Sequence, residues 1–192
     1  MKSLITYLLE SRELRKVVIY GGKFQPFHKG HYEIYEKLVK KFGKSNVFIV
    51  TADLNKRRLK EKEYKSKHIF TFDEKLQILD RMFGIPAKQV IKSSRNPFML
   101  SWKEMPMAGD EYIYISVCGT KDAGRFDGLS NESSTWEEYD DKKDLKSNMT
   151  HKYYYMLDNE KVHLSATEVR NYFRSEHSLE DKKKFFEKAI GK

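Results

Sequence analysis

An apolar run that ends in two glycines places the strongest constraint on this 192-residue chain. Val17–Tyr20 is typical of a buried strand, and it leads directly into Gly21–His31, where two histidines flank a glycine at the expected start of a helix. Glycines let the chain turn sharply and let a ligand approach the backbone, while the free N–H groups at a helix start favour an anion. This arrangement predicts an α/β fold with a phosphate-binding turn after its first strand.

Strands and helices alternate along the rest of the chain, as judged from the spacing of apolar residues. Strands are expected at residues 17–21, 47–50, 90–91 and 112–118, with a fifth at 153–157 or 162–164. Helices are expected at residues 3–14, 30–42, 72–83, 166–174 and 179–190. Continuous apolar strands are typical of a parallel sheet that is covered on both faces. The chain is therefore predicted to be α/β, with a Rossmann-like open parallel five-stranded sheet, helices on both faces and ligands at the carboxyl ends of the strands.

The length suits one domain with a sizeable core. We expect an N-terminal amphipathic helix or leader at residues 1–14 and a domain at 15–192, with a basic loop at 55–68 and a flexible surface loop at 127–150. The single cysteine, Cys118, excludes a disulfide framework and a cysteine metal site. No apolar stretch approaches the ~20 residues that cross a bilayer, and no secretory signal is expected at the N-terminus. A soluble, cytoplasmic protein that does not bind membranes is predicted.

The net charge of +9 raises the question of a nucleic-acid partner. Much of the excess lies in Lys56–Lys67, which holds seven basic and two acidic residues, whereas residues 131–146 hold six carboxylates and three lysines. A basic loop beside the mouth of an α/β sheet attracts a triphosphate as well as it attracts DNA. A solvated loop or substrate steering therefore explains the charge better than nucleic-acid binding does.

The two histidines of the first motif are three residues apart. On a first helical turn His28 and His31 point to the same side, where two imidazoles could stabilise charge on a phosphate during bond formation. The alternatives are a zinc site or two histidines that only cap the helix. Zinc would need a third protein ligand, and the neighbouring sequence offers no cysteine or carboxylate at suitable spacing, so no metal-ligand set is expected.

A second motif, at residues 163–170, leads from a predicted strand into a predicted helix. Ser165 or Thr167 can cap this helix, its free N–H groups offer another anion site, and Arg170 can reach the same phosphates one turn later. Alone, this pattern indicates only the start of a helix. Together with the first motif, it indicates a second wall of a phosphate site.

These two motifs resemble those of the nucleotidylyltransferase (HxGH) superfamily, whose members share a glycine turn, the HxGH element and a late Ser-x-Thr-x-x-Arg element. Gly22–His31 most resembles the archaeal-type nicotinamide-mononucleotide adenylyltransferases, and Phe70–Leu79 and residues 96–98 are also similar to that group. The group usually has arginine where this chain has Lys23. The exchange keeps the charge but loses the planar guanidinium that binds phosphate in a bidentate manner.

The resemblance implies a reaction in which the phosphate of an acceptor attacks the α-phosphorus of ATP in line, releasing pyrophosphate without a covalent enzyme intermediate. It implies that His28 and His31 act at the α- and β-phosphates, and that Lys23 and Arg170 neutralise the leaving pyrophosphate. Magnesium is expected on the triphosphate, bound mostly through water and phosphate oxygens. The implied nucleotide-binding residues of the two motifs are Gly21, Gly22, Phe24, Gln25, Gly30, Ser165, Ala166 and Thr167.

Two further segments are candidates for substrate recognition. In similar enzymes a Gly-x-x-Asp-x-x-Arg-like stretch lies beside the nucleotide, which here corresponds to Gly119, Asp122 and Arg125, although the last two could form only a local surface pair. Trp102 could stack a nicotinamide ring, although a core position explains it as well. The remaining candidates for acceptor binding are Asn96, Phe98 and Lys121.

Three functions are compatible with these motifs. The first is transfer of AMP from ATP to nicotinamide or nicotinate mononucleotide, which the segment Gln25–Phe27 favours. The second is a cytidylyltransferase or a phosphopantetheine-type adenylyltransferase, and the third is a non-catalytic nucleotide- or nucleic-acid-binding module, against which both intact motifs argue. The sequence does not specify whether the chain forms a homo-oligomer. Leu8–Ser11 resembles the cleavage signal of head-maturation proteases in large tailed phages, which would suit a phage-encoded protein.

Overall fold

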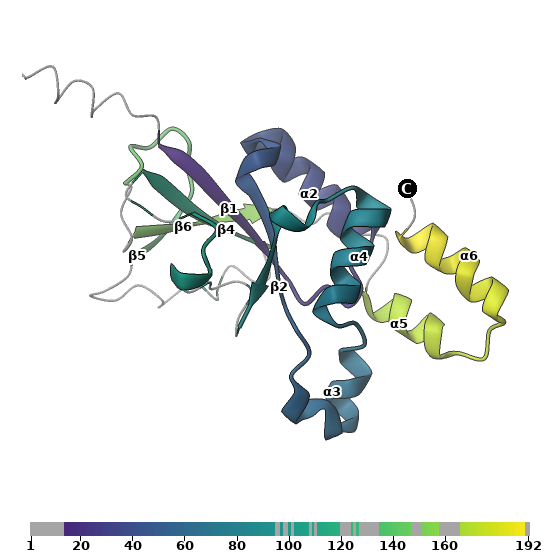
Figure 1. The fold of residues 1–192 in the computed structure, drawn as a ribbon. Coiled ribbons are helices and arrows are strands. Elements are labelled where there is room, and N and C mark those ends of the chain that lie inside the picture. Colours follow the sequence, from purple (N-terminus) through teal and green to yellow (C-terminus); the bar gives the residue numbers. More distant parts are fainter. Residues whose placement is uncertain are drawn as a thin grey trace, which may run out of the picture.

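Six parallel strands form one sheet in this computed structural model (Figure 1). The structure describes residues 14–94, 97, 100, 102–107, 109, 111–119, 124, 126, 135–146, 151–157 and 166–190. The order across the sheet is β3-β2-β1-β4-β6-β5. The strands are β1 (Arg15–Gly21), β2 (Val47–Ala52), β3 (Val90–Ser93), β4 (Tyr112–Gly119), β5 (Thr135–Glu138) and β6 (His151–Leu157). The α-helices are α2 (Lys29–Phe42), α3 (Lys62–Lys67), α4 (Phe72–Phe83), α5 (Ala166–Arg174) and α6 (Leu179–Ile190). Short 3-10 helices are η1 (Lys44–Asn46), η2 (Lys56–Lys60), η3 (Ala87–Gln89) and η4 (Trp102–Glu104).

The strand order reverses beside β1. From β1 the chain moves outward on one side through β2 and β3, and it then returns to pair β4 with the other side of β1. In the β1 register Val18 lies opposite Val47 of β2 and Ile115 of β4. Open α/β sheets bind their ligands at the carboxyl ends of the strands at such a reversal. The first glycine turn follows β1 at this point.

Each face of the sheet buries its own apolar cluster. Alternate residues of β1, such as Val18 and Tyr20, share a core with side chains from α2, α4, α5 and α6. Val17 and Ile19 face the opposite side, where Leu100 and residues near η4 cover the described part of the sheet. Burial of both faces explains why the central strands are continuous apolar runs.

The predicted open parallel sheet is confirmed, but it has six strands and not five. The additional strand, β5, lies within the segment expected to be a surface loop at 127–150, and it pairs in parallel with β6 at the edge of the sheet. This strand is short and polar, so its sequence carries little of the alternation that marks a strand. The predicted fifth strand corresponds to β6, while the alternative at 162–164 and the helix and leader at residues 1–13 lie outside the described residues.

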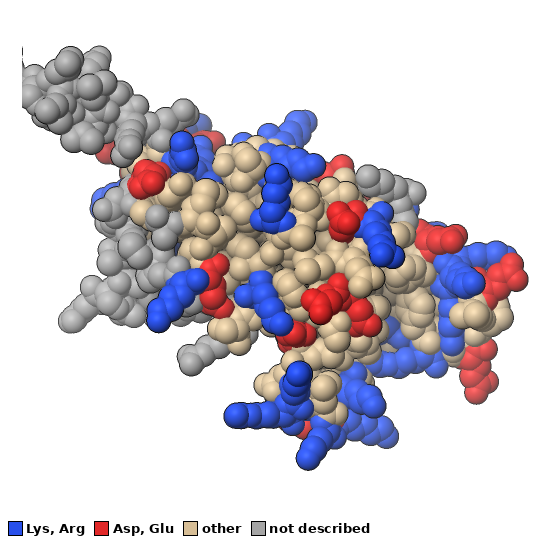
Figure 2. Space-filling model, in the orientation of Figure 1, with Lys and Arg blue, Asp and Glu red and all other residues tan. Residues whose placement is uncertain are grey.

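The basic segment at 55–68 is helical over much of its length and not a simple loop. It forms η2 and α3, where Arg58 pairs with Glu61 at 2.8 Å and Lys67 pairs with Glu63 at 2.6 Å. Figure 2 shows lysine and arginine side chains gathered over the part of the molecule where Figure 1 places α3. The segment is therefore an ordered basic projection beside the end of β2.

Helix α4 has well-defined ends. Thr71 and Glu74 form a reciprocal capping box at its start, and Gly84 ends it in the left-handed conformation.

Across the described part of the chain, no helix combines the length and apolar character that a membrane span requires.

Candidate nucleotidyl-transfer site

The two histidines of the first motif lie against each other at the carboxyl end of β1. His28 immediately precedes α2 and His31 lies in its first turn, and their rings stack with centroids 3.8 Å apart. The backbone N–H groups of His31 and Tyr32 both donate to the carbonyl of His28, at 2.9 and 3.0 Å. The start of the helix thus holds both imidazoles in one place, as their three-residue spacing predicts.

Burial makes both imidazoles hard to protonate. His28 is only 2% exposed, and burial lowers its pKa from the ordinary 6.5 to about 4, although the carboxylate of Glu168 favours the charged form. Burial, and then the neighbouring His28, holds the pKa of His31 well below 6.5. Among the described residues, neither Nδ1 atom has a hydrogen-bond partner. Two neutral rings with unused polar atoms can therefore respond to an anion that approaches them.

The turn between β1 and α2 is shaped by an aromatic side chain as well as by glycine. Phe24 has a backbone φ of 42°, and its buried ring contacts the ring of His31 edge-on with centroids 5.0 Å apart. A Cβ atom on Gly22 would lie 2.6 Å from the Phe24 ring, so Gly22 provides the space for that ring. The amide of Gly22 donates to the carbonyl of Val50 at 3.0 Å. Gly22 and Phe24 therefore set the position of His31.

The side chain of Gln25 is used within the protein. Its Oε1 accepts hydrogen bonds from the backbone N–H groups of Ile69 and Phe70 at 2.9 and 2.7 Å, and its Nε2 donates to the carbonyl of Phe70 at 2.9 Å. Gln25 is 3% exposed. The segment that precedes α4 is thereby fixed to the turn after β1.

Arg170 joins the two sequence motifs. Its Nη1 donates to the carbonyl of Gln25 at 2.8 Å, across 145 positions of sequence, and its Nη2 donates to the hydroxyl of Thr167 at 3.0 Å. The start of α5 therefore lies beside the start of α2, with the half-buried guanidinium between them. Two helix N-termini and a cation converge at one end of β1, which is an arrangement that suits a polyphosphate.

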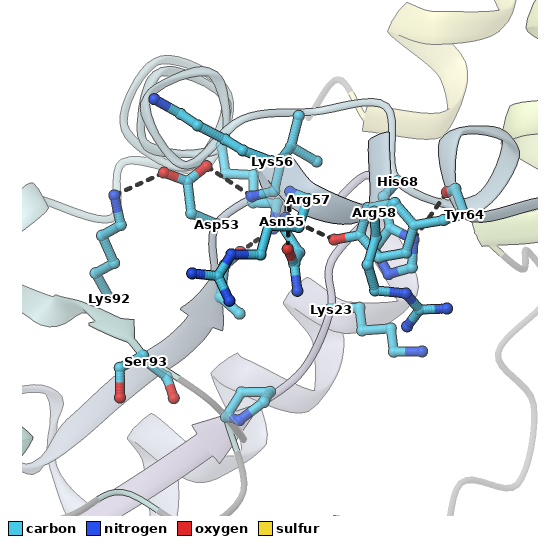
Figure 3. A pocket seen from close by; sticks show the side chains of 15 residues that line it. Lys23, Asp53, Asn55, Lys56, Arg57, Arg58, Tyr64, His68, Lys92 and Ser93 are labelled. Carbon is cyan, nitrogen blue, oxygen red and sulfur yellow. Dashed lines mark hydrogen bonds and ion pairs between the residues drawn. The ribbon is translucent and has the colours of Figure 1, made fainter. Parts of the chain in front are cut away.

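A cavity of about 750 Å³ opens beside this turn, at the ends of β2 and β3 (Figure 3). Lys92 and Asp53 lie at one end of it, joined at 2.6 Å, and Lys23 and His68 lie at the other. Asp53 is the sole carboxylate among the described lining residues. The basic lining residues are Lys23, Lys56, Arg57, Arg58, Lys75 and Lys92. This composition suits an anionic ligand.

One wall of the cavity is made by α3 and the residues that follow it. The ring of His68 stacks on that of Tyr64 with centroids 4.0 Å apart, and the guanidinium of Arg58 lies 4.8 Å from the centre of the Tyr64 ring. The hydroxyl of Tyr64 accepts a hydrogen bond from the amide of Asn55 at 2.8 Å. These contacts hold the basic segment against the mouth of the cavity.

The structure describes most of the predicted site residues. It brings together residues of the turn, of the start of α2 and of α5: Gly21, Gly22, Lys23, Phe24, Gln25, His28, Gly30, His31, Ala166, Thr167 and Arg170. Gly119 ends β4, the strand that pairs with β1. Outside the described residues lie Asn96, Phe98, Lys121, Asp122, Arg125, Ser165 and the side chain of Trp102.

Lys75 and Asp53 are among the cavity residues that sequence reasoning missed. Lys75 follows Phe72 by three positions and precedes Leu79 by four, so helical spacing alone places it on the buried face of α4. Asp53 accepts hydrogen bonds from the N–H groups of Leu54 and Phe72 at 2.7 and 3.0 Å, and its contact with Lys92 holds its pKa at about 2. A carboxylate directly after a buried strand was the signal that could have identified it.

A sequence profile of the cytidylyltransferase-like family matches residues 19–172, which include both motifs. The chain belongs to this family. A probable nicotinate-nucleotide adenylyltransferase of Fusobacterium nucleatum subsp. nucleatum is 25% identical over 187 residues, covering 85% of this chain and 90% of the relative. As a member of the cytidylyltransferase-like family, the chain is a nucleotidyltransferase.

Similar solved structures include the Plasmodium falciparum nicotinic acid mononucleotide adenylyltransferase in complex with APC and in complex with NaAD. The TM-scores are 0.42 and 0.46, at 16% sequence identity, and each alignment covers 88% of this chain and 89% of the other.

No group of three or more histidine, cysteine, aspartate or glutamate side chains that could hold a metal ion occurs within the described part of this family member.

Proposed function

We propose that the protein transfers AMP from ATP to the phosphate of nicotinate or nicotinamide mononucleotide, releasing pyrophosphate. The observation that carries the proposal is the hydrogen bond from Arg170 to the carbonyl of Gln25, because it brings the two anion-binding motifs to the same end of β1. The relative in Fusobacterium nucleatum, by its name, acts on nicotinate nucleotide, and this supports the choice of a pyridine acceptor. The closer kinship with archaeal-type enzymes, suggested by Gly22–His31, stays a prediction.

His28 and His31 are assigned to the α- and β-phosphates. As neutral imidazoles in the free protein they cannot repel each other, and they keep ring N–H groups for donation to phosphate oxygens. A bound polyphosphate raises the pKa of nearby imidazoles by its negative charge, which offsets the penalty of burial. The pair thus gains positive charge only when a substrate is present, where that charge stabilises the phosphorane-like transition state.

The leaving pyrophosphate is assigned to Arg170 and the N-terminus of α5. Lys23, which the resemblance assigns to the pyrophosphate, is proposed to bind the acceptor instead, because it lines the cavity on the other side. Arg170 already uses two of its N–H groups within the protein and keeps others for phosphate oxygens. The backbone N–H groups at Ser165, Ala166 and Thr167 are proposed to bind the β- and γ-phosphates. Magnesium, when bound to the triphosphate, would neutralise part of its charge, and it would be held by phosphate oxygens and water because the site supplies cations and imidazoles.

The acceptor is assigned to the cavity beside Lys23. The attacking phosphate and the leaving pyrophosphate lie on opposite sides of the α-phosphorus in an in-line reaction, so the acceptor must approach from the side away from α5. Lys23 belongs to the turn before the histidines and lines the cavity, where six lysine and arginine side chains face one carboxylate among the described lining residues. Asn96, Phe98, Trp102 and Lys121 remain candidates for binding the pyridine ring, and Gly119, Asp122 and Arg125 for binding the nucleotide.

Pyrophosphate release tests this assignment. The protein is incubated with magnesium and either ATP or CTP, against nicotinate mononucleotide, nicotinamide mononucleotide, phosphocholine and phosphopantetheine. Release with ATP and a pyridine mononucleotide alone is expected. Release with CTP and phosphocholine would instead establish a cytidylyltransferase, and no release with any pair would refute both enzymes.

Two histidine variants make a matched comparison for the site. His28→Ala should reduce kcat by about 100-fold or more, because it removes a donor that acts on charge in the transition state. His177→Ala is the control, since His177 is exposed and stacks on Tyr172 in the connection between α5 and α6. Equal turnover by the two variants would show that the transfer site lies elsewhere.

A further inference from the structure

Lys75 is a buried cation in a helix whose other inward residues are apolar. It lies on α4 and is 2% exposed, whereas lysine is almost never buried without a partner. Its Nζ donates to the hydroxyl of Thr51 at 3.0 Å and to the carbonyl of Ala52 at 2.7 Å. Burial lowers its pKa from 10.5 to about 8, and Asp53 partly offsets the effect. A buried ammonium with so few protein partners calls for a function.

The contacts of Lys75 continue to the phosphate-binding turn. The hydroxyl of Thr51 accepts from Lys75 and donates its own proton to the carbonyl of Lys23 at 3.2 Å. A threonine hydroxyl has one proton to donate, so Lys75 fixes the direction in which Thr51 donates. Three elements, α4, the end of β2 and the turn after β1, are thus joined by two hydrogen bonds.

The same ammonium borders the cavity. An ammonium has three donors, and the described part of the chain supplies acceptors for two of those on Lys75. The carboxylate of Asp53 and the imidazole of His68 interact electrostatically with Lys75, and Lys23 and Arg170 act on the same imidazole. The carboxylate of Asp53 is bound by Lys92 and by two backbone N–H groups. Its charge is therefore largely compensated, and the net charge of the cavity lining stays positive.

We propose that Lys75 is a positioning residue: through the Thr51 hydroxyl it holds the Lys23 backbone so that the Lys23 ammonium meets an anionic acceptor in the cavity. The inference rests on the proposed acceptor site, and it assigns the affinity of that site to a residue of the neighbouring helix. Lys75 stabilises the turn through its hydrogen bond to Thr51. Loss of Lys75 should therefore weaken acceptor binding without a comparable loss of ATP binding.

A double-mutant cycle between Lys75 and Lys23 tests the mechanism. Lys75→Met keeps the length of the side chain but removes the charge and the donors, and we expect it to raise KM for nicotinate mononucleotide about tenfold while kcat changes less than threefold. In a Lys23→Ala background the same substitution should raise KM less than twofold, because the group that Lys75 positions is already absent. Independent, multiplicative effects of the two substitutions would overturn the proposal.

Two further variants separate this role from a purely structural one. Thr51→Val removes the connecting hydroxyl and leaves the ammonium, so it should raise KM about threefold. Lys75→Arg keeps a charged donor, so it should retain acceptor affinity above pH 8, where wild-type Lys75 loses its proton and its hydrogen bond to Thr51 weakens. Identical pH profiles for wild type and Lys75→Arg would contradict the assignment, as would a Thr51→Val variant with unchanged KM.

Titration calorimetry with inorganic phosphate gives a readout that does not depend on turnover. Lys75→Met and Lys23→Ala should each weaken phosphate binding, with the same non-additivity as in KM. If no nucleotide and acceptor pair reacts but this pattern is observed, the proposed reaction fails and the role of Lys75 stands. If turnover is observed and the phosphate affinities are additive or unchanged, the role of Lys75 fails and the reaction stands.

Discussion

The buried histidine pair should make the folded protein sensitive to mild acid. The unfolded chain protonates His28 near its ordinary pKa of 6.5, whereas in the folded protein burial lowers this pKa to about 4. The unfolded state therefore binds more protons between these two values, and stability is lost as the pH falls through this window. At about 1.4 kcal/mol for each pH unit, full protonation of the unfolded state would cost about 3 kcal/mol.

Between pH 7 and pH 4.5, the same relation gives a loss of about 2 kcal/mol from His28 alone. His31 adds a loss of the same sign, because burial and His28 also lower its pKa. Asp53, whose pKa of about 2 is held mainly by Lys92, weakens the fold only at lower pH. A comparison that stops at pH 4.5 therefore reports mainly on the histidines.

The assay is urea unfolding at several pH values, for wild type, His28→Gln and His177→Gln. Glutamine does not titrate, so His28→Gln should lose about 2 kcal/mol less stability than wild type between pH 7 and 4.5. The His177→Gln variant is the matched control at an exposed position. Equal acid sensitivity of wild type and His28→Gln would refute the reasoning, because the proton that destabilises the fold would then bind elsewhere.

Three smaller predictions follow from other contacts. Gln25→Ala should lower the free energy of unfolding by about 1–3 kcal/mol in urea, because it leaves two partly buried backbone N–H groups without their acceptor. Thr71→Ala should cost about 1 kcal/mol in the same assay through loss of the capping box of α4. Arg57→Glu, in the basic η2, should lower kcat/KM about two- to threefold at low salt and have little effect at high salt. The control Lys183→Glu on α6 should leave kcat/KM unchanged at both salt concentrations.

Much of the fold followed from the periodicity of apolar residues. Helices α4, α5 and α6 have the predicted bounds, and the central strands begin or end within two residues of the expected positions. The missed strand, β5, has only half-buried and exposed residues, so no apolar pattern marks it. Its existence depends on pairing with β6, which lies sixteen positions further on in the register, from Thr135 to His151. A pairing between distant segments leaves no local signal in the sequence.

The residues of the candidate site were predictable from the sequence, but their arrangement in space was not. The spacing of His28 and His31 and the cation one turn into α5 identified the two motifs, but it gave no information on how they meet. The bond from Arg170 to Gln25 is a property of the folded chain alone. Phe24 and Gln25 were expected to bind nucleotide, and both side chains are instead buried in contacts with the protein, although their role in the reaction stays a prediction.

The turn after β1 is held from three directions, and this explains how a flexible glycine segment can form a rigid site. Gln25 bonds to the segment before α4, Arg170 of α5 bonds to the backbone of Gln25, and Thr51 of β2 bonds to the backbone of Lys23. Electrostatic catalysis requires that donors stay in position while charge develops on the substrate. Substitution of Gln25 should therefore reduce turnover more than its distance from the phosphates suggests, whereas substitution of Thr51 should act mainly on the KM of the acceptor. Elements from both halves of the chain thus fix the backbone of this turn, as the proposed transfer reaction requires.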